Sequence, residues 1–267
     1  MNMKKNLFLS IIVVNFNHKY FPRMCVEALQ KSVIDFDYEI IFVDNASSDE
    51  SIEYLRKAHL NRDIKLIESD RNLGYGQANN LAVKHAKGDF ILICNPDIFV
   101  NQDSLQKLVD YLKKHEEIGI LAPKLMYHNG HIQESCRRFM TFTDVIIKRT
   151  PLKYLPKFKK KLSKYLMHDF NHNKIQNVDL VTGACFLMQK KVYNELKGFD
   201  PRYFLFMEDF DLCQRVHKAG YKVVYYPEVS VLHFHKRLSG DGFFTLLTKK
   251  VFWLHVSSAI KYFWRWR

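Results

Sequence analysis

The 267-residue sequence has no uninterrupted apolar segment near the roughly 18 residues that a membrane-spanning helix requires. Leu7–Val14 has the length of a signal-peptide core, but Asn15 and Asn17 follow it and no small-residue cleavage site does. A buried first strand explains this run better. Internal repeats and low-complexity linkers are also absent. The length of the chain allows one large or two small globular domains.

Cysteines are few and acidic residues are outnumbered. The five cysteines are scattered, and no two form a Cys-x-x-Cys pair, which argues against a disulfide framework and a zinc knuckle and predicts reduced thiols in the cytosol. Lys and Arg number 41 against 28 Asp and Glu, a formal net charge of +13. This excess favours an anionic partner, whether nucleic acid, anionic lipid or a phosphorylated substrate, without choosing among them.

The first half alternates short β-rich runs with helix-compatible stretches. Near-continuous apolar strands between helices predict βαβ units and an α/β fold, with a mostly parallel central sheet covered by helices on both faces. Ser47–Glu50 predicts a capping box that starts the second helix and turns Ile52 and Leu55 toward the sheet. The expected strands are Phe8–Val14, Glu39–Val43, Ile64–Glu68 and Phe90–Cys94, and the expected helices are Phe21–Lys31, Asp49–His59 and Gly76–Lys87.

The second half is less regular. Ile146–His168 carries eight Lys or Arg residues among aromatic and apolar ones, and the tail from Phe243 to Arg267 is again basic and aromatic. Between them we expect a strand at Asp179–Gln189, a loop entering a helix at Phe199–Gly220, and short strands at Tyr221–Tyr226 and Val229–His235.

Polar side chains follow the predicted parallel strands, and ligands bind beyond the carboxyl ends of such strands. Asn15–Asn17, Asp44–Ser48, Asn72–Gly76 and Asn95–Asp97 are therefore predicted to surround one crevice. The carboxylate and amides after the second strand suit a nucleobase or ribose, although an Asx-turn explains them equally well. The glycines at 74 and 76 lack the third glycine of a dinucleotide fingerprint and follow the third strand, which disfavours a Rossmann dehydrogenase.

Two further groups carry carboxylates. Asn95-Pro96-Asp97 ends the most apolar strand, where oxygen ligands suit Mg²⁺ or Mn²⁺ beside a diphosphate, or where the segment simply forms a turn. Glu208, Asp209 and Asp211 precede a helical stretch; the helix dipole favours them there, and apolar surroundings would raise one pKa and make a general base. His233 and His235 share one face of a predicted strand and are candidate metal ligands.

Taken in order, these segments resemble family 2 glycosyltransferases, especially the bacterial rhamnosyltransferase-like branch. The resemblance runs from about Leu9 to His235 and includes Thr182-Gly183-Ala184 and Gly198-Phe199-Asp200 besides the segments above. It implies a GT-A-type domain over residues 1–240, with a nucleotide-binding half at about 1–125 and an acceptor half at about 126–240. Residues 241–267 would form a basic, aromatic helical tail that associates with the membrane.

The resemblance also implies residue roles. Asp44 would contact the nucleobase, with Asn15 and Asn17 beside the nucleotide. Asp97 matches the metal-binding acidic position, His233 the histidine that completes the metal site, and Asp209 the catalytic base. The remaining donor-site candidates are Asn45, Asn72, Gly74 and Asn95, and candidates for diphosphate or acceptor contacts are Arg137, Arg138, Glu208 and His235. Asn95 departs from the Asp-x-Asp of many members, but Asn-Pro-Asp is typical of the rhamnosyltransferase-like branch.

The function implied is transfer with inversion of a sugar, L-rhamnose from dTDP-L-rhamnose, to a hydroxyl of a lipid-linked glycan in O-antigen-type polysaccharide synthesis. The basic and aromatic segments would dock the enzyme peripherally on the anionic inner face of a bacterial plasma membrane. A UDP-hexose donor is the alternative. A nucleic-acid-binding protein is disfavoured because no recognition motif is present and the Glu208–Asp211 cluster would repel phosphates. A nucleotidyltransferase is disfavoured because Val14–Tyr20 contains no glycine.

Overall fold

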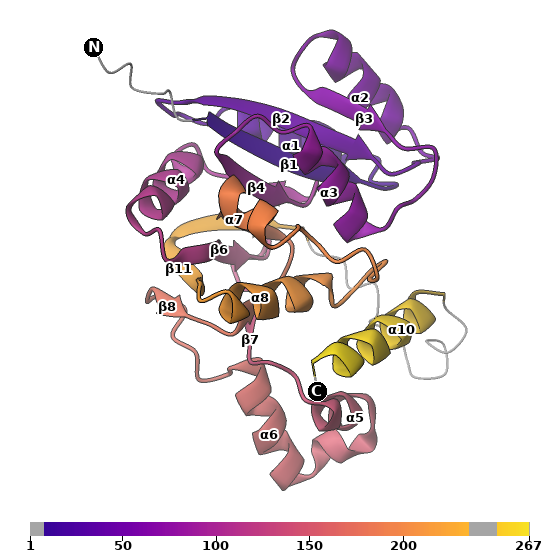
Figure 1. The fold of residues 1–267 in the computed structure, drawn as a ribbon, viewed down its shortest axis with the longest axis vertical. Coiled ribbons are helices and arrows are strands. Elements are labelled where there is room, and N and C mark those ends of the chain that lie inside the picture. The colour runs from indigo at the N-terminus through magenta and orange to yellow at the C-terminus, as the bar shows by residue number, and fades with distance from the viewer. Residues whose placement is uncertain (1–7, 235–249, 267) are drawn as a thin grey trace.

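The computed structural model describes residues 8–234 and 250–266 (Figure 1). The strands are β1 (Phe8–Asn15), β2 (Asp37–Asp44), β3 (Lys65–Glu68), β4 (Phe90–Cys94), β5 (Ile98–Phe99), β6 (Ile118–Met126), β7 (Cys136–Arg137), β8 (Gln176–Asn177), β9 (Leu180–Val181), β10 (Cys185–Gln189) and β11 (Lys222–His233). The helices are α1 (Phe21–Gln30), α2 (Ser51–Leu60), α3 (Tyr75–Lys84), α4 (Ser104–Lys114), α5 (Phe142–Arg149), the 3₁₀ helix η1 (Pro151–Tyr154), α6 (Pro156–Leu166), α7 (Lys190–Glu195), α8 (Glu208–Lys218) and α10 (Lys250–Arg265).

Nine strands of the described chain form one mixed sheet, in the order β3-β2-β1-β4-β10-β6-β11-β5, with β8 paired to β11 beside this path. The first four strands are mutually parallel, and β11 is parallel to β6. Strand β10 runs antiparallel to both neighbours, β4 and β6. Strands from the beginning and the end of the chain therefore belong to the same sheet.

Residues that alternate along the strands build two apolar layers, one on each face of the sheet. Helices α1, α2 and α4 cover one face, where they pack on strand residues that include Ile11, Leu92 and Leu187. Helices α3, α7 and α8 cover the other face, where they pack on Ile12 and Phe186. Burial on both faces explains why the strands are apolar at nearly every position.

The expected α/β architecture is confirmed, and the first-half elements lie within a few residues of their predicted bounds. The predicted capping box is wrong. The residue that caps α2 is Glu50, without a side-chain hydrogen bond, while the Ser47 hydroxyl accepts hydrogen bonds from the loop after β1. Leu55 is buried as expected, but Ile52 is only half-buried. A capping box does start α5, between Thr141 and Asp144.

Two strand predictions in the second half need correction. Asp179–Gln189 is not one strand: β9 pairs with β7 in a separate two-stranded sheet, and the chain turns at residues 182–184 before β10 enters the main sheet. Tyr221–Tyr226 and Val229–His235 are not two strands but one, β11, whose register shifts between Tyr226 and Ser230. Pro227 lies within that shift, where its missing N–H costs no ladder hydrogen bond.

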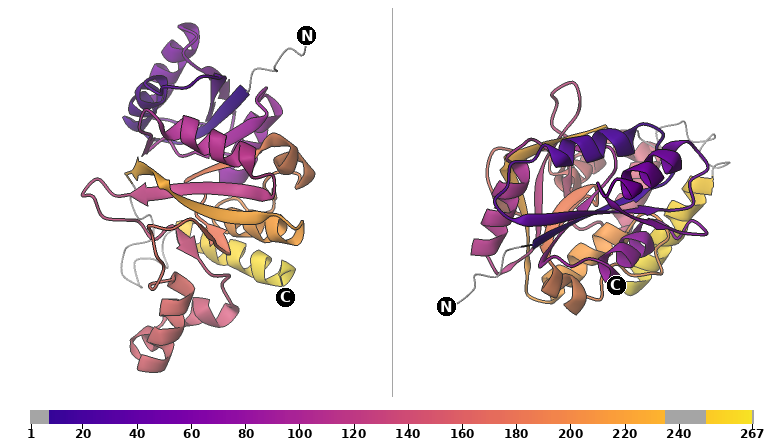
Figure 2. Two further views of the ribbon diagram at one scale, coloured as in Figure 1. Left: turned by 90° about the vertical axis from the view of Figure 1, so that its left-hand side faces the viewer. Right: turned by 90° about the horizontal axis from the view of Figure 1, so that it is seen from above.

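The basic segment and the tail lie on the same side of the molecule. Helices α5 and α6 project from one end, away from β1–β3, and α10 lies alongside α8 (Figures 1 and 2). Phe142 of α5 contacts Phe263 of α10, with ring centroids 5.7 Å apart. Within residues 8–234 and 250–266, no helix is long and apolar enough to cross a membrane.

Candidate active site

The loops after β1 and β2 are joined by a polar network that is buried at Asn15 and Asp44. Asn15 and Asp44 are paired in register at the strand ends, and Asn15 Nδ2 donates to Asp44 Oδ1 at 2.9 Å. The second oxygen of Asp44 accepts from the Ser47 N–H at 2.9 Å, a local bond that spans three residues rather than the two of an Asx-turn. Asn17 takes the left-handed conformation, φ 56°, and its Oδ1 accepts from the Ser48 N–H. The structure thus brings Asn15, Asn17 and Asp44 together as predicted.

Three more predicted residues join β2 to the start of α3. Asn45 Nδ2 donates to Asn72 Oδ1 at 2.9 Å, and Asn45 Oδ1 accepts from the Leu73 N–H at 2.8 Å. Gly74 has φ 79°, and a Cβ there would lie 2.1 Å from the Phe204 carbonyl oxygen. Only glycine therefore permits the loop that leads to α8 to approach the start of α3 this closely.

Beyond these loops a cavity of about 590 Å³ opens between β4, the segment before β7, the turn after β9 and the start of α8. Of the residues predicted for the site, it brings together Asn95, Arg137, Glu208, Asp209 and His233. The other lining residues are Tyr75, Tyr127, Ile132, Gln133, Glu134, Ser135, Thr182, Gly183, Ala184, Leu205 and Phe206.

His233 lines this cavity, and Asp97 lies directly beside it. Both are buried, and Asp97 Oδ1 is 3.5 Å from His233 Nε2. Gln133 Nε2 donates to the His233 carbonyl, so Gln133 Oε1 is left to accept from His233 Nδ1 at 2.8 Å, and His233 Nε2 faces Asp97. Burial opposes ionisation of Asp97, yet His233, with a smaller contribution from His18, outweighs it and lowers the pKa of Asp97.

This pair fits a divalent cation shared with a ligand. One cation with bonds of about 2.1 Å to each atom would span a separation of this size. Gln133 orients the imidazole as outer partners of metal-bound histidines do. Among the described residues, no group of three or more His, Cys, Asp or Glu side chains converges on one point. Further oxygens would have to come from a bound diphosphate and water, which is how Mg²⁺ usually binds beside nucleotides.

Asp209 lies in the first turn of α8 and is held by two peptide N–H groups. Its Oδ2 accepts from Gly183 N and its Oδ1 from Phe210 N, each at 2.9 Å. A Cβ on Gly183 would lie 3.3 Å from the Asp209 Cβ, which is a tight contact, so glycine lets Asp209 pack closely against this turn. Burial raises the pKa of Asp209, and the amide donors partly offset that rise.

Glu208 is the contrasting neighbour. Its side chain is buried, and its Oε2 has no hydrogen-bond partner among the described residues. Burial, followed by the charge of Asp209, raises the pKa of Glu208 well above its ordinary value. The two carboxyl groups therefore differ: burial favours the uncharged form of Glu208, and the amide donors favour the ionised form of Asp209.

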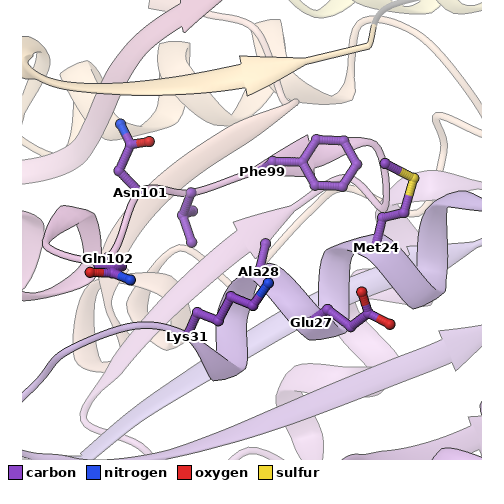
Figure 3. A pocket seen from close by; sticks show the side chains of 8 residues that line it. Met24, Glu27, Ala28, Lys31, Phe99, Asn101 and Gln102 are labelled. Atoms are coloured by element: carbon purple, nitrogen blue, oxygen red, sulfur yellow. The ribbon is translucent and has the colours of Figure 1, made fainter.

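The structure separates the two predicted arginines. Arg137 lines the cavity, and its Nη1 donates to the Cys136 carbonyl. Arg138 does not line it; it is exposed and forms an ion pair with Asp179 at 3.3 Å. His235 lies outside the described residues. A second cavity, of about 320 Å³ between α1 and the chain after β5, includes none of the predicted site residues (Figure 3).

Among the cavity residues without a predicted role, three hold other site residues in place. Gln133 is 100 positions from His233 in the chain, and no sequence signal links them. Tyr75, whose hydroxyl donates to the Gly183 carbonyl at 2.5 Å, and Gly183 itself lie in segments that carry the family resemblance. Their function in holding the turn beside Asp209 depends on contacts across 108 residues of sequence.

The fold and the site define a class: a nucleotide-sugar-type α/β domain with polar loops at the strand ends and a carboxylate, Asp209, that lines a cavity beside them. The family model for glycosyl transferase family 2 matches residues 10–197, and the chain belongs to that family. It is a glycosyltransferase with rhamnosyltransferase-named relatives. The rhamnosyltransferase WbbL of Escherichia coli K12 is 27% identical over 96% of this chain and 93% of its own length.

A second relative is the N-acetylglucosaminyl-diphospho-decaprenol L-rhamnosyltransferase of Mycobacterium tuberculosis, 26% identical over 74% of this chain; the chain spans 66% of that protein. Among solved structures, GalNAc-T7 with UDP, GalNAc and Mn²⁺ has a TM-score of 0.66 at 17% identity, covering 87% of this chain and 45% of its own. The Pyrobaculum calidifontis mannosyltransferase PcManGT with GDP-Man and Mn²⁺ has a TM-score of 0.59 at 18% identity, covering 86% and 57%. These similarities establish the GT-A fold.

Replacing Glu208 by Gln is expected to stabilise the folded chain at alkaline pH. Folding raises the pKa of Glu208 above its ordinary value of 4.5. Between that value and the raised one, the folded chain holds a proton that the unfolded chain releases, so the free energy of unfolding falls as pH rises. Glu208→Gln removes that fall, raising the free energy of unfolding by about 1–3 kcal/mol near pH 8. Thermal melts from about pH 5 to pH 8 test this.

Glu117→Gln is a control of opposite sign. Its own backbone hydrogen bond, then Lys222 and His115, lower the pKa of this half-exposed residue, so neutralising it is expected to lower Tm slightly above pH 5. A Glu208→Gln variant that melts like the wild type at both ends of the range contradicts the assignment.

Proposed function

We propose that this enzyme transfers L-rhamnose from dTDP-L-rhamnose, with inversion, to a hydroxyl of a lipid-linked glycan during synthesis of a bacterial cell-surface polysaccharide. The observation that carries the proposal is the Asp209 carboxylate, which lines the cavity and is held by two peptide N–H groups. The names of the relatives support the sugar and the lipid-linked acceptor. The Asn95-Pro96-Asp97 sequence adds support for the rhamnosyltransferase-like branch.

In this proposal Asp209 is the general base. It removes the proton from the acceptor hydroxyl while that oxygen forms a bond to the anomeric carbon. The bond from that carbon to the diphosphate oxygen breaks, and the nucleoside diphosphate leaves with the electron pair. The raised pKa of Glu208 favours its uncharged form, which would keep a second negative charge away from the incoming hydroxyl.

The donor would lie across the ends of β1, β2 and β4. Asn15, Asn17 and Asp44 serve the nucleoside, with the Asn45–Asn72–Gly74 network holding the adjoining loop. Asp97 and His233 would hold Mg²⁺ or Mn²⁺ near Asn95, and such a cation, when bound, offsets charge developing on the diphosphate. Of the two arginines proposed for diphosphate or acceptor contacts, Arg137 lines the cavity. Arg138 is better explained as a surface ion pair.

We propose that the exposed side chains of α10, Phe142 and α6 form the surface that docks on the membrane, next to the site of the acceptor. On α10 the side chains of Trp253, Ile260 and Trp264 are 59–69% exposed. Phe142 is 60% exposed beside them, and α6 carries exposed lysines at 157, 159, 160, 161 and 164. Tryptophan favours the membrane interface, and each basic residue near an anionic surface contributes about 1 kcal/mol. This arrangement supports peripheral docking on the inner leaflet.

Asp209→Asn is expected to lower transfer by at least the 10²–10⁴-fold that a general base typically contributes. The measurement is transfer of radiolabelled rhamnose from dTDP-L-rhamnose to a synthetic N-acetylglucosaminyl-diphospho-lipid. Nucleotide affinity should stay within about twofold, since Asp209 is not part of the loops after β1 and β2. Normal turnover by the variant would remove Asp209 from the role of base.

Calorimetric titration with dTDP, UDP, GDP and ADP, each with and without Mn²⁺, is expected to show metal-dependent binding that favours dTDP. Asp97→Ala should abolish the Mn²⁺ dependence, while Asp103→Ala, an exposed carboxylate paired with Lys107, should retain it. A preference for UDP would replace rhamnose by a UDP-hexose as the donor. Absence of binding by a folded sample would overturn the site.

Co-sedimentation with vesicles containing anionic lipid is expected at low salt and should be lost near 1 M salt, where the Debye length is about 3 Å. The double variant Trp253→Ser, Ile260→Ser should bind less, whereas Leu60→Ser, at an 81% exposed position on α2, should bind like the wild type. A wild-type protein that stays in the supernatant at low salt contradicts membrane docking.

A further inference from the structure

The loop before α8 adopts an unfavourable backbone conformation immediately before Asp209. Phe206 and Met207 are consecutive non-glycine residues in the left-handed region, with φ 68° and 66°. Two such residues persist only where the surroundings fix them. Since Glu208 and Asp209 follow directly, the direction in which α8 starts, and therefore the place of the Asp209 carboxylate, depends on what holds this pair.

Helix α10 contacts this loop both before the strained pair and at the pair itself. Ser258 Oγ donates to the Leu205 carbonyl at 2.8 Å, and Lys261 Nζ donates to the Arg202 carbonyl at 2.9 Å. The His255 ring stacks on Phe206 with centroids 4.5 Å apart. Tyr203, Met207, Ala259 and Tyr262 form one buried apolar cluster between the loop and the helix.

The end of α10 also holds α8 itself, through Asp211. This carboxylate has no solvent exposure and lies in the first turn of α8, two residues after Asp209. Its Oδ1 accepts from Trp266 Nε1 at 2.9 Å and lies 3.3 Å from Arg265 Nη1. Its Oδ2 accepts from Arg215 Nε at 2.7 Å. Arg265 also pairs with Asp200, at the other end of the loop.

From these contacts we infer that α10 positions the catalytic base: Trp266 and Arg265, acting on Asp211, together with Ser258 and Lys261 on the loop carbonyls, fix the strained loop and the first turn of α8. None of the four residues lines the cavity, so they are positioning residues. The inference rests on the proposed role of Asp209, and it assigns to the C-terminal helix a part in turnover separate from membrane contact.

Trp266→Phe tests the inference, because it keeps an aromatic ring and removes the indole N–H that α10 donates to Asp211. Hydrogen–deuterium exchange is expected to quicken in residues 202–211 only, with the loops after β1 and β2 unchanged. Tyr221→Phe is the matched control: it removes one aromatic donor from a carboxylate, Glu195, outside the cavity. A uniform rise in exchange along the chain, or no rise, overturns the inference.

In the rhamnosyl-transfer assay, Trp266→Phe should lower kcat about tenfold, with KM for the donor and the stoichiometry of nucleotide binding within about twofold of wild type. Tyr221→Phe should leave all three unchanged. An unchanged kcat in an active enzyme overturns the inference. If Trp266→Phe does not fold, the same exchange measurement is made on Ser258→Ala. Faster exchange in residues 202–211 of that variant is expected, and unchanged exchange there overturns the inference.

The two proposals fail in different ways. A wild-type chain that binds nucleotides but transfers no rhamnose contradicts the proposed donor or acceptor, while the exchange pattern still reports on α10. Conversely, normal exchange at residues 202–211 in both Trp266→Phe and Ser258→Ala contradicts the positioning role, even where Asp209→Asn abolishes transfer.

Discussion

The half-buried Asp209 carboxylate at the start of α8 accepts hydrogen bonds from Gly183 N and Phe210 N. These peptide dipoles stabilise its ionised form, and the Gly183 N–H is placed there by a distant part of the chain. Gly183 is in turn held by the Tyr75 hydroxyl at the beginning of α3. The first turn of α8, the turn after β9 and the first turn of α3 therefore depend on one another.

The hydrogen-bond partners available at the start of α8 also explain why its three neighbouring carboxyl groups differ. Glu208 lacks a partner for Oε2 among the described residues and has a raised pKa, Asp209 receives two amide donors, and Asp211 is compensated by Arg215, Arg265 and Trp266. Three acids within four residues thus occupy three different electrostatic environments. Their helix-terminal position is favourable for all of them, but it does not distinguish one from another.

The tail has two faces with different surroundings. One face of α10 packs on the loop before α8 through Ser258, Ala259 and Tyr262, all buried. The other exposes Trp253, Ile260 and Trp264. The aromatic, basic composition of the tail predicted attraction to a membrane surface. It did not indicate that one face of the helix packs on the loop before α8 instead.

Sequence by itself determined the α/β architecture, because apolar strand patterns and helical spacing are local signals that burial on both faces of a sheet requires. It also placed the polar strand ends together, since the carboxyl ends of parallel strands lie at one edge of the sheet. Only the tertiary structure decided that β10 and β11 insert into the same sheet, that Gln133 orients His233, that Arg138 turns away from the cavity, and that α10 reaches Asp211. These side-chain contacts join residues 41 to 100 positions apart, and no local pattern encodes them, because they form only when the whole core has packed.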